Sequence, residues 1–152
     1  MIEIDDYQNR FGGIQRLVGT KESETLKNSH VCIVGIGGVG SWAVEALART
    51  GVGELTLIDL DDVCINNTNR QIHAMDGEIG KPKVVAMAER VRRINPNCKV
   101  HVVENFFTES TAEELLSPGF DFVFDAIDSL NNKCLLLALC RRKKIPVVTT
   151  GG

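Results

Sequence analysis

Apolar residues occur along this chain in two patterns, short uninterrupted runs and longer stretches with helical spacing. Uninterrupted runs bounded by glycine, proline or charged residues are typical of strands that are buried on both faces of a parallel sheet. Such runs predict strands over residues 31–34, 54–59, 100–103, 122–127 and 146–149.

Apolar residues with helical spacing fill the intervals between these runs. Pro82 suits the first turn of a helix, and Gly51 is a typical residue at a helix end. Before the first strand, the stretch 7–29 predicts one or two short helices, broken at Gly12-Gly13 and at Gly19. The other predicted helices cover residues 39–50, 82–94, 111–116 and 131–142.

The regular alternation of strand and helix predicts an α/β protein with parallel strands and right-handed crossovers. We therefore expect a Rossmann-like doubly wound sheet with strand order 3-2-1-4-5. Residues 1–30 are expected to form an N-terminal helical segment, and residues 31–152 a single nucleotide-binding core. Because the chain ends directly after the fifth predicted strand, the sheet is expected to be truncated there.

Composition narrows the possible classes of protein. Hydrophobic residues make up 43% and charged residues 24%, which is typical of a globular domain and not of a disordered or fibrous chain. The net charge of -3 provides no overall attraction for nucleic acid. No apolar run reaches the roughly 20 residues that cross a bilayer, so we expect no membrane partner and a cytoplasmic location. The five cysteines include no C-x-x-C pair, which favours reduced, buried thiols.

The segment Gly35-Ile36-Gly37-Gly38-Val39-Gly40 has the spacing G-x-G-x-x-G after a strand and before a helix. In that context the first glycine permits a tight turn, the second lets the backbone approach a phosphate, and the third lets helix and strand pack closely. The anion then lies at the helix N-terminus, where amide groups are unpaired. The motif predicts a nucleotide site without choosing the nucleotide.

Three further side chains bear on the choice of nucleotide. Asp59 follows the second predicted strand, 24 positions after Gly35, and an acidic residue at about this offset binds a ribose hydroxyl in NAD and ATP sites alike. Arg70 and Lys83 come after it. A triphosphate that is being cleaved develops negative charge that such cations neutralise, so their presence favours ATP.

Two carboxylates follow the fourth predicted strand in Asp125-Ala126-Ile127-Asp128. Mg²⁺ in nucleotide sites is usually held by one or two carboxylates together with phosphate oxygens. The alternative is structural, since Asp128 or Ser129 can cap the helix that follows. The local sequence leaves both open, and the neighbouring ATP motifs favour Mg²⁺ at Asp128.

The order of these motifs resembles that of the ThiF/MoeB/HesA group, adenylating enzymes related to ubiquitin activation. The matching motifs are GIGGVG, Asp59-x-Asp61-x-Val63, Asn67-x-x-Arg70-Gln71, Gly80-x-Pro82-Lys83 and Asp125-Ala126-Ile127-Asp128. Within the group, the segments RFGGIQRLVG, DDVCINNTNRQIHA and CRRKKIPVVTTGG are most similar to the tRNA threonylcarbamoyladenosine dehydratases. The resemblance covers nearly the whole chain.

This resemblance implies an enzyme that uses ATP and Mg²⁺ to activate the carboxylate of threonylcarbamoyladenosine in tRNA, after which ring closure removes water. It implies catalytic roles for Arg70, Lys83 and Asp128, with Asp128 as the metal ligand. It also implies a homodimer, with sulfur-acceptor or cysteine desulfurase proteins as further partners. Together with the motifs, it predicts nucleotide binding by Gly35, Gly37, Gly38, Gly40, Asp59, Asp61, Asn67, Arg70, Gln71, Lys83 and Asp128.

Several alternatives remain open at this point. The same fold serves adenylation of the C-terminus of a ubiquitin-like or sulfur-carrier protein, and less favoured readings are an NAD(P)-dependent oxidoreductase and a non-catalytic nucleotide-binding scaffold. The family's intersubunit arginine is replaced by glycine in Arg10-Phe11-Gly12-Gly13-Ile14, and Arg16 is a candidate replacement. The histidines are dispersed in the sequence and receive no role.

Overall fold

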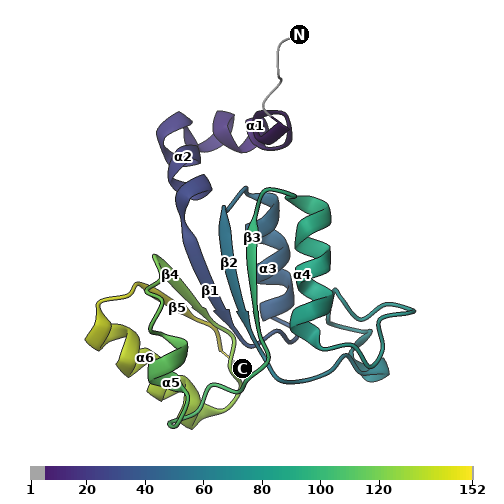
Figure 1. The fold of residues 1–152 in the computed structure, drawn as a ribbon, viewed down its shortest axis with the longest axis vertical. Coiled ribbons are helices and arrows are strands. Elements are labelled where there is room, and N and C mark those ends of the chain that lie inside the picture. Colours follow the sequence, from purple (N-terminus) through teal and green to yellow (C-terminus); the bar gives the residue numbers. More distant parts are fainter. Residues whose placement is uncertain (1–5, 152) are drawn as a thin grey trace.

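A computed structural model describes residues 6–151 and shows a five-stranded parallel sheet with the order β3-β2-β1-β4-β5 (Figure 1). The predicted Rossmann-like α/β fold and its strand order are therefore confirmed. The strands are β1 (His30–Val34), β2 (Glu54–Ile58), β3 (Lys99–Val103), β4 (Phe122–Asp125) and β5 (Val147–Thr149).

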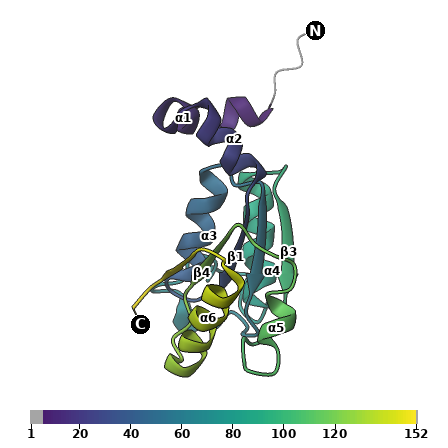
Figure 2. The same cartoon turned by 90° about the vertical axis from the view of Figure 1, so that its left-hand side faces the viewer.

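Helices cover both faces of the sheet (Figures 1 and 2). On one face, α3 (Gly40–Arg49) and α4 (Lys83–Ile94) pack on the central strands through a core that includes Val44, Leu55 and Met87. On the other face, α5 (Ala112–Leu115) and α6 (Leu130–Lys143) enclose a second core that includes Val34, Val123 and Leu136. Burial of these apolar side chains is the main force that holds the layers together.

The first two helices, α1 (Asp6–Val18) and α2 (Thr20–Asn28), lie beyond the amino ends of the strands (Figure 1). The predicted break at Gly12-Gly13 is wrong, because α1 runs through both glycines; the break at Gly19, where φ is 107°, is confirmed. Phe11 and Gly12 are buried and the Tyr7 hydroxyl donates to the Gly51 carbonyl oxygen at 2.7 Å. These tertiary contacts outweigh the low helix propensity of glycine.

The strand boundaries differ slightly from those predicted. β1 begins at His30, which pairs with Glu54, one residue earlier than predicted. The first five residues of the predicted N-terminal segment, residues 1–5, lie outside the part that the structure describes. β4 ends at Asp125, two residues earlier than predicted, because the Asp125 carboxylate accepts a hydrogen bond from the Ile127 amide at 3.0 Å and turns the chain.

Two other expectations are affected by the structure. Cys32, Cys98 and Cys140 are buried as expected, but Cys64 and Cys134 are exposed, so burial does not apply to all the thiols. Among the described residues, no helix has both the length and the apolar character that a membrane span requires.

Candidate nucleotide site

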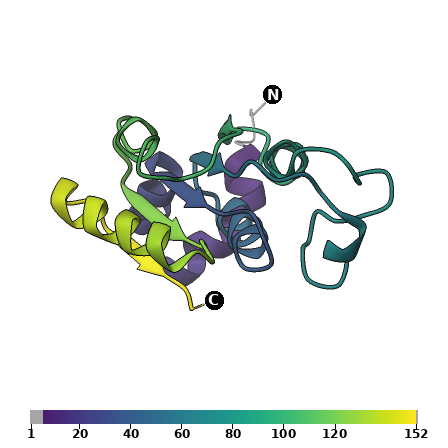
Figure 3. The ribbon, with the colours of Figure 1, turned by 90° about the horizontal axis from the view of Figure 1, so that it is seen from below.

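A cavity of about 1000 Å³ opens at the carboxyl ends of the strands, the edge that faces the viewer in Figure 3. Ligands of open α/β sheets bind at this edge, where the strand order reverses. Here β1 is the reversal point, since β2 and β4 lie on either side of it. The predicted residues that line the cavity are Gly35, Gly37, Gly38, Asp59, Asp61, Asn67, Arg70, Gln71, Lys83 and Asp128.

The glycines of the loop have two separate uses. Gly35 has a φ of 93°, and a Cβ added there would lie 2.6 Å from the Ala126 carbonyl oxygen. Gly40, which was predicted to bind the nucleotide, is buried and is not among the residues that line the cavity. A Cβ at Gly40 would lie 1.7 Å from the Gly35 carbonyl oxygen, so its glycine is required by close packing of helix and loop.

The Asp59 carboxylate is held in a defined orientation directly after β2. One oxygen accepts from the Ile36 amide at 2.6 Å, and the other accepts from the Asp61 amide at 2.8 Å. Each carboxylate oxygen has a second lone pair, so the group can still accept hydrogen bonds from a ligand. Asp59 therefore links the glycine loop to the segment that follows β2.

Lys83 is brought into the cavity from a position far along the sequence. Its ammonium lies 3.0 Å from Asp61 Oδ2, and its amide donates to the Asp61 carbonyl oxygen at 3.0 Å. The Lys83 side chain is only 8% exposed, whereas that of Asp61 is 56% exposed. A desolvated ammonium at a cavity wall interacts with an anion more strongly than a surface lysine does.

Arg70 lies against the glycine loop. Its aliphatic carbons approach to 3.4 Å of the Cβ position at Gly38, and its guanidinium donates to the Asn66 carbonyl oxygen and to Asn69 Oδ1, both at 3.0 Å. The Trp42 indole donates to the Arg70 carbonyl oxygen at 3.0 Å. These contacts hold one cation beside the glycine loop.

The two carboxylates after β4 have different environments. Asp125 is fully buried and accepts hydrogen bonds from the Lys133 ammonium at 2.7 Å and the Thr149 hydroxyl at 2.6 Å, in addition to the Ile127 amide. Asp128 is exposed and lines the cavity. The helix begins after Ser129, which makes no side-chain cap hydrogen bond. Asp125 therefore has a structural role, and Asp128 is the carboxylate that faces the cavity.

Sequence reasoning missed other residues at this edge. Asn105, Phe106 and Thr108 line the cavity from the segment after β3, and Asn132 lines it from α6. None belongs to a spaced motif, so only the fold brings them to the nucleotide site. The candidate Arg16 lies exposed on α1, beyond the opposite edge of the sheet, and does not line this cavity.

The Asp125 cluster yields a stability prediction. We expect Asp125→Asn to lower the free energy of unfolding by about 2 kcal/mol, because the mostly buried Lys133 ammonium loses its charged acceptor. Thermal melting should show this as a decrease in Tm of roughly 4–8 °C. Asp128→Asn is the matched control in the same loop, and an equal decrease in Tm for both variants would contradict the assignment.

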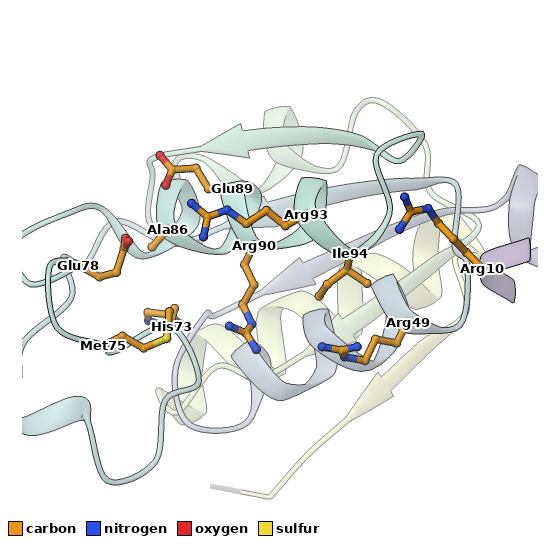
Figure 4. A pocket seen from close by; sticks show the side chains of 10 residues that line it. All are labelled: Arg10, Arg49, His73, Met75, Glu78, Ala86, Glu89, Arg90, Arg93 and Ile94. Atoms are coloured by element: carbon orange, nitrogen blue, oxygen red, sulfur yellow. The ribbon is translucent and has the colours of Figure 1, made fainter. Parts of the chain in front are cut away.

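A second cavity, of about 410 Å³, lies among α1, α3, α4 and the segment before α4 (Figure 4). Its arginines are largely neutralised: Arg49 and Arg90 contact Glu45, and Arg10 contacts Asp6. Burial, and then the charges of Lys83 and Arg90, lower the pKa of His73 to about 4, so this ring is uncharged at neutral pH. The larger cavity is therefore the better candidate for an anionic ligand.

The fold, the glycine loop and the cations at the carboxyl edge of the sheet are those expected of a nucleotide-binding α/β protein. Residues 11–152 match the ThiF family, and the chain belongs to that family.

Relatives within this family agree with the predicted resemblance. The chain is 56% identical to the tRNA threonylcarbamoyladenosine dehydratase of Escherichia coli, over 97% of this chain and 55% of the relative, and 52% identical to that of Haemophilus influenzae, over 100% and 58%. It is 37% identical to the Escherichia coli molybdopterin-synthase adenylyltransferase, over 83% of this chain and 50% of the relative. The chain thus spans a little over half the length of the dehydratases it matches.

Solved structures show the same relationship. The crystal structure of the Escherichia coli dehydratase TcdA in complex with ATP superposes with a TM-score of 0.96 at 55% identity, and the match covers 100% of this chain and 63% of that chain. The structure of PaaA superposes with a TM-score of 0.85 at 30% identity, covering 99% and 49%.

Proposed function

We propose that the protein, in its full length, is an ATP-dependent dehydratase that cyclises N6-threonylcarbamoyladenosine in tRNA. The observation that carries the proposal is the convergence of Asp59, Arg70 and Lys83 on the glycine loop, at the carboxyl edge of a sheet. Sequence identity of 56% to a tRNA threonylcarbamoyladenosine dehydratase supports the choice of substrate.

In this proposal the cavity binds ATP. Backbone amides of the glycine loop receive the phosphates, Asp59 accepts from the ribose, and Arg70 and Lys83 lie against the triphosphate. Asn67 and Gln71 line the same wall. Asp128 would hold Mg²⁺, which supplies charge neutralisation to the phosphate oxygens.

The reaction has two steps. A carboxylate oxygen of the substrate attacks the α-phosphorus and pyrophosphate leaves, which turns a poor electrophile into an acyl adenylate. A nitrogen or oxygen of the same modified nucleoside then attacks the acyl carbon, AMP leaves, and a ring closes. The net result is the loss of one water from the nucleoside. In the first step, the Arg70 and Lys83 cations stabilise the negative charge that develops on the phosphate oxygens.

The same proposal includes the assembly and location of the protein. We infer a homodimer, sulfur-acceptor or cysteine desulfurase proteins as further partners, and a cytoplasmic location where tRNA and ATP are both present. Size-exclusion chromatography with light scattering tests the dimer on the full-length protein.

Nucleoside mass provides the decisive test. Full-length protein is incubated with ATP, Mg²⁺ and tRNA that carries threonylcarbamoyladenosine, and the nucleosides are then analysed by mass spectrometry. Loss of one water that requires ATP supports the proposal. If the nucleoside is unchanged and the C-terminus of a sulfur-carrier protein is adenylated, the protein instead has an activity of the molybdopterin-synthase adenylyltransferase type.

Binding of ATP also yields a prediction at Asp59. We expect Asp59→Asn to weaken ATP binding by about tenfold, because a charged hydrogen bond to the ribose contributes about 1.5 kcal/mol or more. Isothermal titration should show a smaller loss of affinity for tripolyphosphate, which has no ribose and is affected only through the bond between Asp59 and the glycine loop. Glu104→Gln removes an exposed carboxylate after β3 that does not line the cavity, and it should bind ATP normally. Equal losses for ATP and tripolyphosphate would refute the ribose contact.

A further inference from the structure

Two histidines and a glutamate meet at the amino edge of the sheet, the end of the strands nearest α1 and α2 (Figure 1). His30, Glu54 and His101 come from β1, β2 and β3, which are adjacent strands. His30 is paired with Glu54, and His101 with Thr56. Because paired residues and residues two apart share a face, all four side chains project from the same side of the sheet.

Distances among the polar atoms suit a metal ion. Glu54 Oε1 lies 2.7 Å from His101 Nε2 and 3.8 Å from His30 Nδ1, and one ligand atom from each residue lies within 4.8 Å of the others. In a tetrahedral zinc site with bonds of about 2.1 Å, ligand atoms are about 3.3 Å apart. The observed separations lie on both sides of that value, so small side-chain rotations suffice to give the three ligand atoms the spacing of a zinc site.

The surroundings of His30 orient its ring. Its Nε2 lies 2.8 Å from the hydroxyl of the buried Thr56, and the Phe120 ring packs against it in a T-shaped arrangement with centroids 4.9 Å apart. Metal-bound histidines usually donate their other ring N–H to such an acceptor. When Nε2–H donates to Thr56, the Nδ1 lone pair faces Glu54.

We propose that His30, Glu54 and His101 form a binding site for a divalent transition metal, with zinc as the preferred ion. Imidazole nitrogen favours zinc and related ions over Mg²⁺. Two histidine nitrogens and one carboxylate oxygen are a ligand set that is known in zinc sites. The His101 side chain is 51% exposed and that of His30 is 18% exposed, so solvent reaches one side and supplies a water as the fourth ligand.

The position of the site defines its role. It lies at the opposite edge of the sheet from the nucleotide cavity, whose residues it does not share. A bound ion there links three neighbouring strands, so its effect is on the stability of the sheet and not on chemistry at ATP. The site is therefore independent of the proposed dehydratase activity and of the Mg²⁺ that accompanies ATP.

Cobalt substitution tests the proposal on nucleotide-free protein. Titration with Co²⁺ should give a visible spectrum of the tetrahedral type, saturating at one ion per chain and abolished by Zn²⁺. The spectrum should lack thiolate charge-transfer bands, which would indicate binding at Cys64 or Cys134. Zn²⁺ at 100 times its dissociation constant should raise Tm by roughly 5–10 °C.

Two variants make the test specific. His101→Gln keeps a hydrogen-bond donor for Glu54 but removes a ligand, and we expect at least a tenfold loss of Co²⁺ affinity and of the tetrahedral bands. Lys99→Gln changes an exposed residue on the same face of β3 and should retain both. The proposal would be overturned if the wild-type protein lacked tetrahedral bands or if the His101→Gln protein kept them. Either result would show that His101 and Glu54 form only a hydrogen-bonded pair.

Discussion

Lys83→Met is expected to lower kcat/KM of the ATP-dependent reaction roughly 100-fold or more, which is the usual result of removing one group that stabilises developing charge. The Lys83 ammonium lies almost entirely out of solvent at the wall of the nucleotide cavity. Methionine fills nearly the same volume without the charge. Because Asp61 is 56% exposed, its carboxylate remains hydrated after the substitution, so we expect a change in stability of less than about 1 kcal/mol.

The matched control is Lys81→Met, two residues earlier. Lys81 also forms close ion pairs, with Glu78 and Glu89 at 2.8 Å each, but it does not line the cavity. Steady-state kinetics of both variants, with thermal melting alongside, separate the two roles. Similar losses of activity in the two variants would show that Lys83 acts through general charge or folding, and not at the triphosphate.

Gly40→Ala is expected to be among the most destabilising single substitutions in the protein. The added Cβ would lie 1.7 Å from the Gly35 carbonyl oxygen and 3.3 Å from Ala126 Cβ. A backbone carbonyl cannot rotate away as a side chain can, so helix α3 must move from the loop. We expect a loss of at least about 3 kcal/mol, seen as a decrease in Tm of roughly 10 °C or as insoluble protein.

Gly37→Ala provides the contrast within the same motif. The nearest atom to its added Cβ is Gln71 Nε2 at 3.9 Å, so the fold should tolerate it and Tm should change by less than about 2 °C. Gly37 lines the cavity, and a side chain there should weaken ATP binding by blocking the approach of the phosphates. A stable, ATP-binding Gly40→Ala protein would contradict the division of roles between the two glycines.

The architecture followed from the sequence because its signals are local. Uninterrupted apolar runs reflect strands that are buried on two faces, and helical spacing reflects helices that are buried on one face. Neither pattern depends on distant residues. The G-x-G-x-x-G spacing similarly places the loop at a strand end and a helix start, and residues 35–40 occupy that place. The order of strands then follows from the doubly wound arrangement, in which the strand before the glycine loop is the point where the order reverses.

Errors arose where tertiary contacts outweighed local preference. Gly12-Gly13 remains helical because Phe11 and Gly12 pack against the rest of the protein. The choice of Asp128 over Asp125 as the carboxylate at the cavity agrees with the structure, but only the fold shows that Lys133 and Thr149 hold Asp125.

The sequence by itself determined the fold class, the strand order, the glycine loop and the family resemblance, since each is encoded in the spacing of neighbouring residues. Tertiary structure alone decided which charged groups meet: Lys83 with Asp61 across 22 positions, and His30 with Glu54 and His101 from three strands. The reason is physical, since an isolated antiparallel bridge between Asp62 and Pro82 brings Lys83 to Asp61, and the register of three packed parallel strands brings the two histidines to Glu54.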